Sequence, residues 1–335
     1  MHAGSSCGSF AIHNDDTEKG SAMRIGIIAD SACDLPNDFI ERENITILPV
    51  TVQIGQAVLA DVRNEEATMS FLSGETAARA FEAETTPFTV QQVHDLFLNK
   101  LVHDYDYVFC ITTTRTRSGI HDNAQQASFT ILNDYKQVRS ASGNNTPFAL
   151  RVIDSQSVFA GVGVPVIEAV RMRAAGETPP RIRAHLESVA AKTHTYMVPP
   201  DLNYLRNRIK KRGDKSVSFL SATLGTALDI KPILHCNQGE TGPVGKVKGF
   251  SAASKKLFEF TSERVASGLL VPTINLSYGG ALDEMRALPG YEQLRNVCAD
   301  RGVEVYESFM GLSGLVNVGR GALVVGFAAQ PHRFG

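Results

Sequence analysis

Apolar, β-branched runs alternate with amphipathic segments through the first half of this 335-residue chain, and this alternation is the strongest constraint on its fold. The runs are short enough for strands, and the segments between them repeat their apolar residues with a helical period. We predict strands at 24–29, 45–54, 107–111 and 148–154, and helices at 36–43, 91–102, 120–135 and 163–176. This order favours a mostly parallel sheet whose ligands bind beyond the carboxyl ends of the strands.

The second half has more antiparallel character. We predict helices at 181–193, 251–267 and 282–302, strands at 194–199, 271–279, 303–309, 312–319 and 322–328, and a hairpin at 231–249 around Asn237-Gln238-Gly239. The expected fold class is α/β with two domains, in which an N-terminal mostly parallel sheet with flanking helices precedes a C-terminal mixed α/β domain. The predicted boundaries are a disordered leader at 1–22, an N-terminal domain at 23–178 and a C-terminal domain at 179–335.

Composition excludes several classes of protein. The net charge is −2 and no long basic run occurs, which argues against a nucleic-acid partner. No apolar stretch approaches 18 residues, so we expect no membrane-spanning helix and at most transient contact with a membrane surface. The first 22 residues lack the basic and apolar regions of a signal peptide. Five widely spaced cysteines without a CxxC pair fit a reducing, cytoplasmic setting.

Motifs for nucleotides, nucleophilic catalysis and metals are incomplete. Gly161-Val162-Gly163 and Gly319-Arg320-Gly321 do not extend to GxGxxG, and neither a P-loop nor a GxSxG elbow occurs. The nine histidines are scattered, so we predict neither a metal site nor a cofactor. Asp30 and Asp34 could share a cation, but the favoured interpretation is that Asp30 caps a local turn and Asp34 caps the next helix.

Two hydroxyl-rich segments precede predicted helices and are candidates for binding an anion. Ser118 and Gly119 stand where the chain enters the helix at 120–135, and amide groups at a helix start carry partial positive charge. Thr85 and Thr86 precede another helix and could reach the same spot, although threonine before a helix is often a cap. An alternative is an enzyme, a hydrolase or acyl transferase, that uses Ser118 with His121.

The order of segments along the chain resembles the DegV family from residue 24 to about 328. The series is IIADSACDLP, ILPVTVQIG, ETTPFTVQQ, a strand into RSGIHDNA, VIDSQSVFAGVG, LDIKPIL, GPVGKVKG and GRGALVVGF. The resemblance implies a two-domain α/β protein, not itself an enzyme, that binds one long-chain fatty acid in an apolar tunnel. It also implies a bacterial, cytoplasmic subunit that presents the acid to an ATP-binding fatty acid kinase subunit, which forms an acyl phosphate.

The resemblance also assigns site residues. The family's Thr-Ser-Gln-Pro falls on residues 85–88, so Thr85 and Thr86 match carboxylate-binding hydroxyls, while Gln-Pro has become Pro-Phe. The family's Ser-Gly-Thr falls on residues 118–120, which gives Ser118 and Gly119 the same role. Additional pocket residues implied by the match are Asp30, Ser31, Asn317 and Tyr278.

Three positions differ from the family pattern. The Gly-Gly-Arg-Ile segment is replaced by RGDKSVSF at 212–219, which leaves its arginine without a clear counterpart. Asn317 stands where the family has a closing histidine. Tyr278 or Ser277 stands where the family has a basic or histidine side chain after the late strand.

The acyl chain and the carboxylate of a bound fatty acid would contribute unequally to the binding free energy. Each buried methylene contributes about 0.8 kcal/mol, whereas a charge-assisted hydrogen bond to the head contributes about 1–3 kcal/mol. We therefore expect the acyl chain to dominate affinity and the hydroxyl groups to fix orientation.

Overall fold

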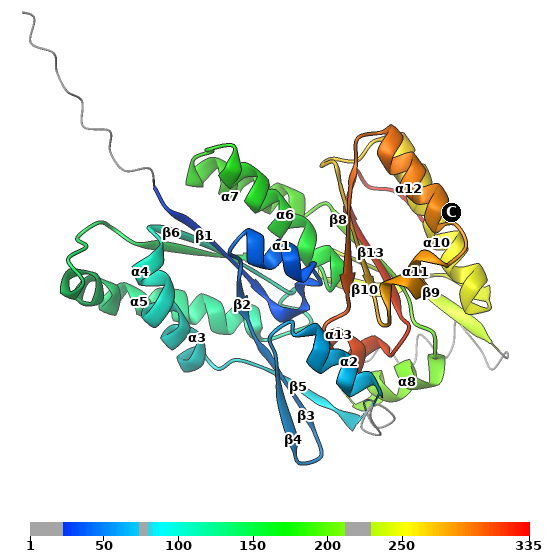
Figure 1. Cartoon of the computed structure of the whole chain (residues 1–335), viewed down its shortest axis with the longest axis horizontal. Helices are drawn as coiled ribbons and strands as arrows, with labels where there is room; N and C mark the ends of the chain where they lie inside the picture. Colours follow the sequence, from blue (N-terminus) through cyan, green and yellow to red (C-terminus); the bar gives the residue numbers. More distant parts are fainter. Residues whose placement is uncertain (1–22, 74–79, 81, 212–228) are drawn as a thin grey trace, which may run out of the picture.

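The computed structural model describes residues 23–73, 80, 82–211 and 229–335. The predicted leader at 1–22 and the segment at 212–219 lie outside the described residues. The described chain forms two large sheets and one small sheet, with helices on the faces of the large ones (Figure 1).

The first large sheet is parallel throughout and has the strand order β2-β1-β6-β7. Its strands are β1 (Ile25–Asp30), β2 (Thr46–Leu48), β6 (Tyr107–Thr112) and β7 (Ala149–Asp154). One face packs on α3 (Val90–Leu96), a π-turn (Phe97–Leu101), α4 (Val102–Asp104) and α5 (Ile120–Ala141). The other face packs on α1 (Asn37–Arg42), α6 (Ala160–Ala174) and α7 (Pro179–Ala190). A short 3₁₀ turn (Ser31–Cys33) follows β1.

The prediction of one strand at 45–54 is wrong, because Pro49 divides it between two sheets. β2 ends at Leu48, and β3 (Val50–Ile54) pairs antiparallel with β4 (Ala57–Asp61) and β5 (Glu84–Pro87) in the small sheet. Proline has no amide hydrogen to donate to a ladder, so a strand ends readily there. The small sheet projects from one side of the molecule near α2 (Glu65–Ser73) (Figure 1).

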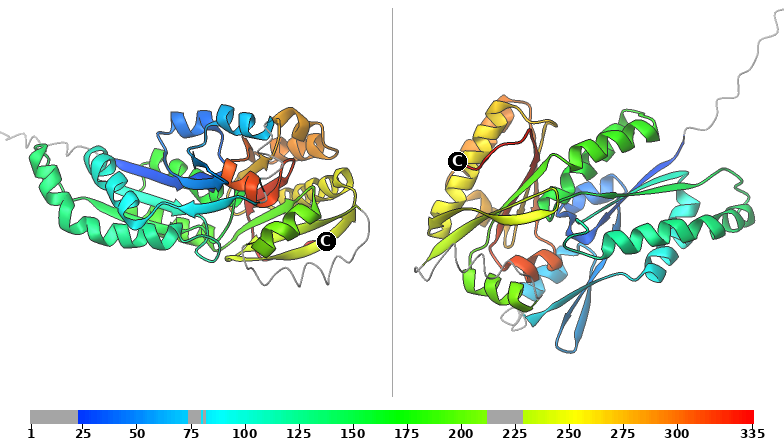
Figure 2. Two further views of the ribbon diagram at one scale, coloured as in Figure 1. Left: turned by 90° about the horizontal axis from the view of Figure 1, so that it is seen from below. Right: turned by 180° about the vertical axis from the view of Figure 1, so that it is seen from behind.

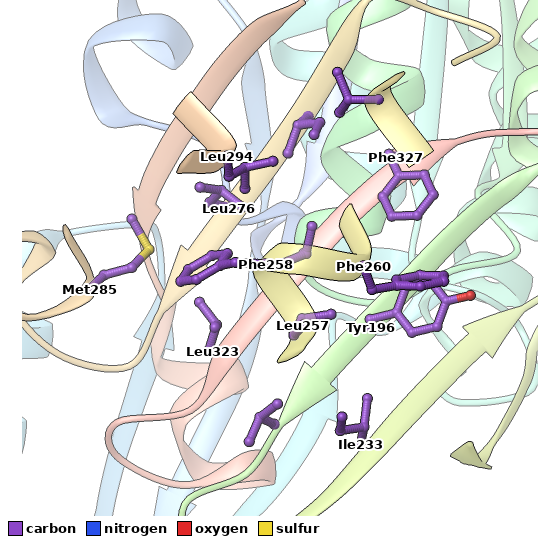
Figure 3. Packing of buried hydrophobic residues seen from close by; sticks show 14 of the residues in the cluster. Tyr196, Ile233, Leu257, Phe258, Phe260, Leu276, Met285, Leu294, Leu323 and Phe327 are labelled. Carbon is purple, nitrogen blue, oxygen red and sulfur yellow. The ribbon is translucent and has the colours of Figure 1, made fainter. Parts of the chain in front are cut away.

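The second large sheet is mixed, with the strand order β10-β9-β8-β13-β11-β12, and only β11 and β12 run parallel. Its strands are β8 (Thr193–Val198), β9 (Ile230–Asn237), β10 (Glu240–Lys248), β11 (Thr273–Tyr278), β12 (Glu304–Phe309) and β13 (Leu323–Ala328). One face packs on α10 (Phe250–Ser267), α11 (Leu282–Arg286) and α12 (Tyr291–Asp300) around the cluster that Figure 3 shows. The predicted fold class, with a parallel first sheet and a mixed second sheet, is confirmed.

Two local predictions are wrong. Residues 312–319 were expected as a strand but form α13 (Leu312–Val318), which ends at Gly319 with φ of +94°. The segment is buried on nearly every side, so its apolar residues show no period that separates helix from strand. The helical period at 120–135 predicts Ala124, Ala127, Ile131 and Leu132 on the inward face of α5. The first three are buried, but Leu132 is 52% exposed because the helix packs on one side only.

Helix α6 lies between the two large sheets, as Figures 1 and 2 show. It contributes to the core of the first sheet through Val162 and Val166 and to that of the second through Ala160. The predicted domain boundary at 178–179 falls between α6 and α7 and stays a prediction. In the described residues, no helix is both long and apolar enough to span a membrane.

Candidate functional site

A cavity of about 260 Å³ opens at the carboxyl ends of β1 and β6, where the three sheets and α8 (Leu202–Lys211) meet. Its apolar wall comes from many elements: Val50, Val158, Phe159, Met197, Leu205, Ile209, Leu234 and Val318. Its polar groups are Thr85, Thr113, Arg117, Ser118, Gly119, Arg208, Thr241, Ser313 and Asn317. Most of the surface area of the wall is apolar, and an apolar surface with converging polar groups is the usual composition of a small-molecule site.

The start of α5 supplies one side of the cavity. Gly119 is the N-cap residue with φ of −72°, and the Ile120 amide donates to Ser118 Oγ at 3.3 Å. A Cβ placed on Gly119 would meet only Pro87 Cγ, at 3.8 Å, so open space lies beside this backbone. The N-terminus of a 22-residue helix directs partial positive charge toward that space.

The structure separates Thr85 from Thr86. Thr85 and Gly119 both line the cavity, whereas Thr86 is exposed and does not line it. The two residues are consecutive in β5, where successive side chains point to opposite faces. The expectation that both threonines reach the same spot therefore holds for Thr85 alone.

Arg208 of α8 is a cavity residue that sequence reasoning missed. Its side chain is buried, with 2% exposure, and its guanidinium donates to the Ala83 carbonyl. Nε donates to Asn317 Oδ1 at 3.1 Å, and Nη2 lies 3.5 Å from Thr85 Oγ1. Arg208 therefore connects two predicted residues and brings a positive charge to the cavity wall.

A signal for Arg208 was present in the sequence. It stands three residues after Leu205 and directly before Ile209, in the apolar stripe of a helix that is otherwise basic and polar.

Asn317 lines the cavity, and α13 positions it. Its amide nitrogen donates to the Ser313 carbonyl at 2.7 Å, four residues earlier in the helix. The start of α13 is fixed by Asp61, whose carboxylate accepts from the Ser313 amide at 2.8 Å and from the Ser313 hydroxyl.

Asp30 and Ser31 lie behind the cavity wall and do not line it. Asp30 is fully buried and accepts from the Ala32 amide at 2.9 Å, from the Thr113 amide, and from Thr113 Oγ1 at 3.1 Å. Ser31 Oγ accepts from the Val50 amide at 3.1 Å. Both residues thus hold lining residues in place, and Asp30 caps the local turn as predicted. Burial raises the pKa of Asp30 to about 6.

Tyr278 lies away from the cavity, contrary to its prediction as a pocket residue. It belongs to the core cluster under α10 and α12, on the far face of the second large sheet. In the ladder with β13 it pairs with Leu323 of the same cluster, whereas the neighbouring Ser277 pairs with Val324 on the cavity side. Successive side chains of a strand point to opposite faces, so Tyr278 points away from the cavity side on which Ser277 lies.

The alternative pairing of Ser118 with His121 is not formed in the described structure. His121 Nδ1 lies 3.1 Å from Thr112 Oγ1, and Ser118 Oγ instead accepts from the backbone. Burial lowers the pKa of His121 and so favours its neutral form. His121 is therefore paired with Thr112 and not with Ser118 in the described part of the chain.

Asp34 has a different role from the predicted helix cap. Its carboxylate accepts from Arg63 Nη1 at 2.8 Å, from the Gly311 amide at 2.9 Å and from Ser277 Oγ at 2.7 Å. Pro36 occupies the N-cap position of α1 and has no side-chain cap. Asp34 therefore joins the first large sheet to the second.

The described residues contain neither a cluster that could hold a metal ion nor a disulfide. No group of three or more His, Cys, Asp or Glu side chains there could hold a metal ion. The four described cysteines, Cys33, Cys110, Cys236 and Cys298, are buried thiols outside any disulfide. Cys7 lies outside the described residues.

Comparison with known proteins identifies relatives over nearly the whole chain. Residues 24–330 match the profile described as an uncharacterised protein of the DegV family. A DegV domain-containing protein of Xanthomonas campestris is 57% identical over 312 residues, which cover 93% of this chain and 99% of the relative. One of Streptomyces coelicolor is 27% identical and covers 72% of this chain and 78% of the relative.

Solved structures of low sequence identity share the fold. A DegV lipid-binding protein from Thermotoga maritima superposes with a TM-score of 0.70 at 21% identity, covering 93% of this chain and all of that one. DegV from Bacillus subtilis, described as a fatty-acid-binding protein, gives 0.70 at 20% identity, with 92% of this chain and all of that one covered. The profile match and the 57% identity to the Xanthomonas protein show that the chain belongs to the DegV family.

Proposed function

We propose that this protein binds one long-chain fatty acid, with the acyl chain against the apolar wall and the carboxylate at Thr85, Ser118 and Gly119. The observation that carries this proposal is the convergence of these three residues on one cavity, although they come from segments more than thirty residues apart. The two DegV structures above are described as lipid- and fatty-acid-binding proteins, which supports the ligand class.

The polar groups of the cavity suit a carboxylate. Ser118 Oγ and Thr85 Oγ1 can donate hydroxyl hydrogens, and the backbone at Gly119 leaves space for close approach. Arg208, buried beside Thr85, lowers the electrostatic cost of a negative charge in this wall. Charge-assisted hydrogen bonds of this kind fix orientation, while the apolar wall supplies most of the affinity.

The protein itself carries out no chemistry in this proposal. Ser118 has no general base, and the cavity wall lacks a nucleophile–base pair among the described residues. We propose that it presents the bound acid to an ATP-binding kinase subunit, which transfers a phosphoryl group to the carboxylate. That step is tested by mixing the loaded protein with the kinase subunit and ATP and trapping acyl phosphate with hydroxylamine. A loaded protein that yields no hydroxamate with an active kinase would contradict it.

Native mass spectrometry of the purified protein, followed by lipid extraction, tests the binding site. We expect one bound mass that matches a C14–C18 fatty acid and is lost in the Thr85→Ala/Ser118→Ala double variant. The matched control is Thr130→Ala/Ser267→Ala, which removes the same two hydroxyl types from exposed helix positions. A fatty acid that survives in the double variant would refute the carboxylate assignment, and a folded wild type without lipid would refute the function.

A further inference from the structure

Asp61 ends strand β4 and is buried, with 2% exposure, although it does not line the cavity. Its Oδ1 accepts from the Arg63 amide at 3.2 Å, and its Oδ2 accepts from both the amide and the hydroxyl of Ser313. Ser313 is the second residue of α13, whose N-cap Gly311 has no side chain with which to cap the helix. A carboxylate from β4 therefore satisfies the start of α13.

Glycine at position 311 leaves room for this contact. A Cβ there would lie 3.1 Å from Asp61 Oδ2 and 2.5 Å from Arg63 Nη1. The φ angle of Gly311 is −62°, which any residue can adopt, so space and not backbone conformation favours glycine here. The small sheet and α13 are thus in close contact at Asp61.

Asn317 continues this line of contacts one helical turn later. Its Nδ2 donates to the Ser313 carbonyl at 2.7 Å, and its Oδ1 accepts from Arg208 Nε at 3.1 Å. A carbonyl only accepts and a guanidinium only donates, so these two partners fix which end of the amide faces Arg208. A shift at the start of α13 would therefore move the oxygen that holds Arg208.

The small sheet carries both ends of this line of contacts. Arg208 donates to the Ala83 carbonyl, just before β5, and its Nη2 lies 3.5 Å from Thr85 Oγ1 in that strand. Strand β3 lies between β4 and β5, so one strand holds both the strand that ends at Asp61 and the strand that carries Thr85. Asp61, α13, Arg208 and the small sheet therefore form a closed ring of contacts, which restricts the position of the guanidinium.

We propose that Asp61 is a positioning residue for the head-group site, because it holds α13 so that Asn317 keeps the Arg208 guanidinium in place. The inference rests on the proposed function, in which the charge of Arg208 favours a carboxylate in this wall. Binding groups keep their geometry when hydrogen bonds behind them lock their rotamers. Asp61 therefore contributes to the selection of a charged head over a neutral one without lining the cavity.

The test is a double-mutant cycle with Asp61→Asn, Arg208→Met and the two combined. Palmitate affinity is measured by competition with a fluorescent lipid, below the melting temperature of every variant. Asparagine cannot accept on its nitrogen, so it cannot keep the contacts of both Asp61 oxygens. We expect Asp61→Asn to weaken palmitate binding by about fivefold and hexadecanol binding by less than about twofold. In the Arg208→Met background, Asp61→Asn should cause no further loss of palmitate affinity.

The sign of the effect separates positioning from simple electrostatics. Loss of a buried negative charge near an anion would strengthen palmitate binding through Coulomb's law, whereas a displaced guanidinium weakens it. Asp106→Asn is the matched control, because this carboxylate accepts from Arg24 and Arg139 just before β6, at the end of that strand away from the cavity. The control should lower the melting temperature and leave palmitate affinity unchanged.

Asn317→Ala gives a second cycle if Asp61→Asn does not fold, since it interrupts the same line of contacts. It should also weaken palmitate binding in the wild type and cause no further loss in the Arg208→Met background. Three results would each overturn the positioning role and leave fatty-acid binding intact: equal palmitate losses in both backgrounds, unchanged or tighter palmitate binding by Asp61→Asn, or wild-type palmitate affinity in Arg208→Met. Equal losses of palmitate and hexadecanol in Asp61→Asn would overturn it in favour of a packing role. No palmitate binding by the wild type would overturn the proposed function itself.

Discussion

Arg63 and Asp34 form a buried ion pair in which Nη1 lies 2.8 Å from Oδ1. The two side chains are 5% and 0% exposed and come from the segments after β4 and β1. Arg63 Nη2 also donates to the Leu35 and Phe309 carbonyls, at 3.0 and 2.8 Å, so one guanidinium connects the loop after β1 to the end of β12. The pair is placed to hold the junction that forms the cavity.

Replacing Arg63 with Met should destabilise the protein strongly, because Asp34 would remain buried without its counter-charge. The expected loss in the free energy of unfolding is about 3–5 kcal/mol, measured by urea denaturation. Arg42→Met is the control, since its ion pair with Asp38 is exposed and should change stability by less than about 1 kcal/mol. If both variants lose the same small amount, the buried pair does not hold the junction.

Gly119→Val should separate ligand binding from stability. The residue has φ of −72° and only Pro87 Cγ near an added Cβ, so the folded protein should accept the side chain with little strain. The same side chain would occupy the space proposed for the carboxylate. We expect an unchanged melting temperature and at least a tenfold loss of palmitate affinity by isothermal titration calorimetry. Normal palmitate affinity in this variant would move the head group elsewhere.

Arg208→Met should weaken binding of a charged head more than of a neutral one. The variant removes the buried positive charge beside Thr85 while keeping much of the packing volume. We expect at least a tenfold loss for palmitate and a smaller loss for hexadecanol, measured by competition with a fluorescent lipid. Arg206→Met on the same helix is the matched control, because Arg206 does not line the cavity. Equal losses for palmitate and hexadecanol would show that Arg208 acts through packing.

Asp30→Asn should change how stability depends on pH. Burial raises the pKa of Asp30 to about 6, so between about pH 4 and 6 the folded state binds a proton that the unfolded state has lost. The contribution of Asp30 to stability is therefore full below pH 4 and is lost as the pH rises through 6. The unfolding free energy of the wild type minus that of the variant should therefore fall by about 3 kcal/mol from pH 4 to 7. A pH-independent difference would contradict this assignment.

The stacked side chains of His194 and His235 in the second large sheet should make the folded protein less stable as the pH falls. His194 Nδ1 lies 2.9 Å from His235 Nε2, and His332 Nε2 lies 3.0 Å from the Tyr196 hydroxyl. Burial, with added repulsion from His332, lowers the pKa of His194 to about 3 and that of His235 to about 4. Both groups therefore remain neutral in the folded state under conditions that protonate them in the unfolded state.

Folded-state stability should consequently fall as the pH drops from 6.5 towards 4, because the unfolded state gains protons that the folded state excludes. His235→Phe keeps a ring in the stack and should flatten this part of the pH profile in thermal unfolding. His103→Phe, at an exposed position, should leave the profile as it is in wild type. A profile that remains steep in His235→Phe would exclude a titrating role for His235.

The sequence predicted the parts of the site that depend on local pattern. Ser118, Gly119 and Thr85, predicted because each precedes a helix, do line one cavity, and their role in binding an anion stays a prediction. Thr86 was misplaced because strand β5, with its two-residue alternation, was not predicted. Arg208 was missed because its role arises from contacts with Asn317 and Thr85, in segments distant along the chain, which local periodicity does not encode.

Helix α6 has a consequence for the width of the cavity. A Cβ on Gly161 would collide with Thr195 and Ser157, and one on Gly163 with Asn275 and the Cys33 carbonyl. These two glycines therefore act as the spacers that set how closely the two large sheets approach. A methyl group at either position would push the two large sheets apart and change the shape of the cavity, although neither glycine lines it.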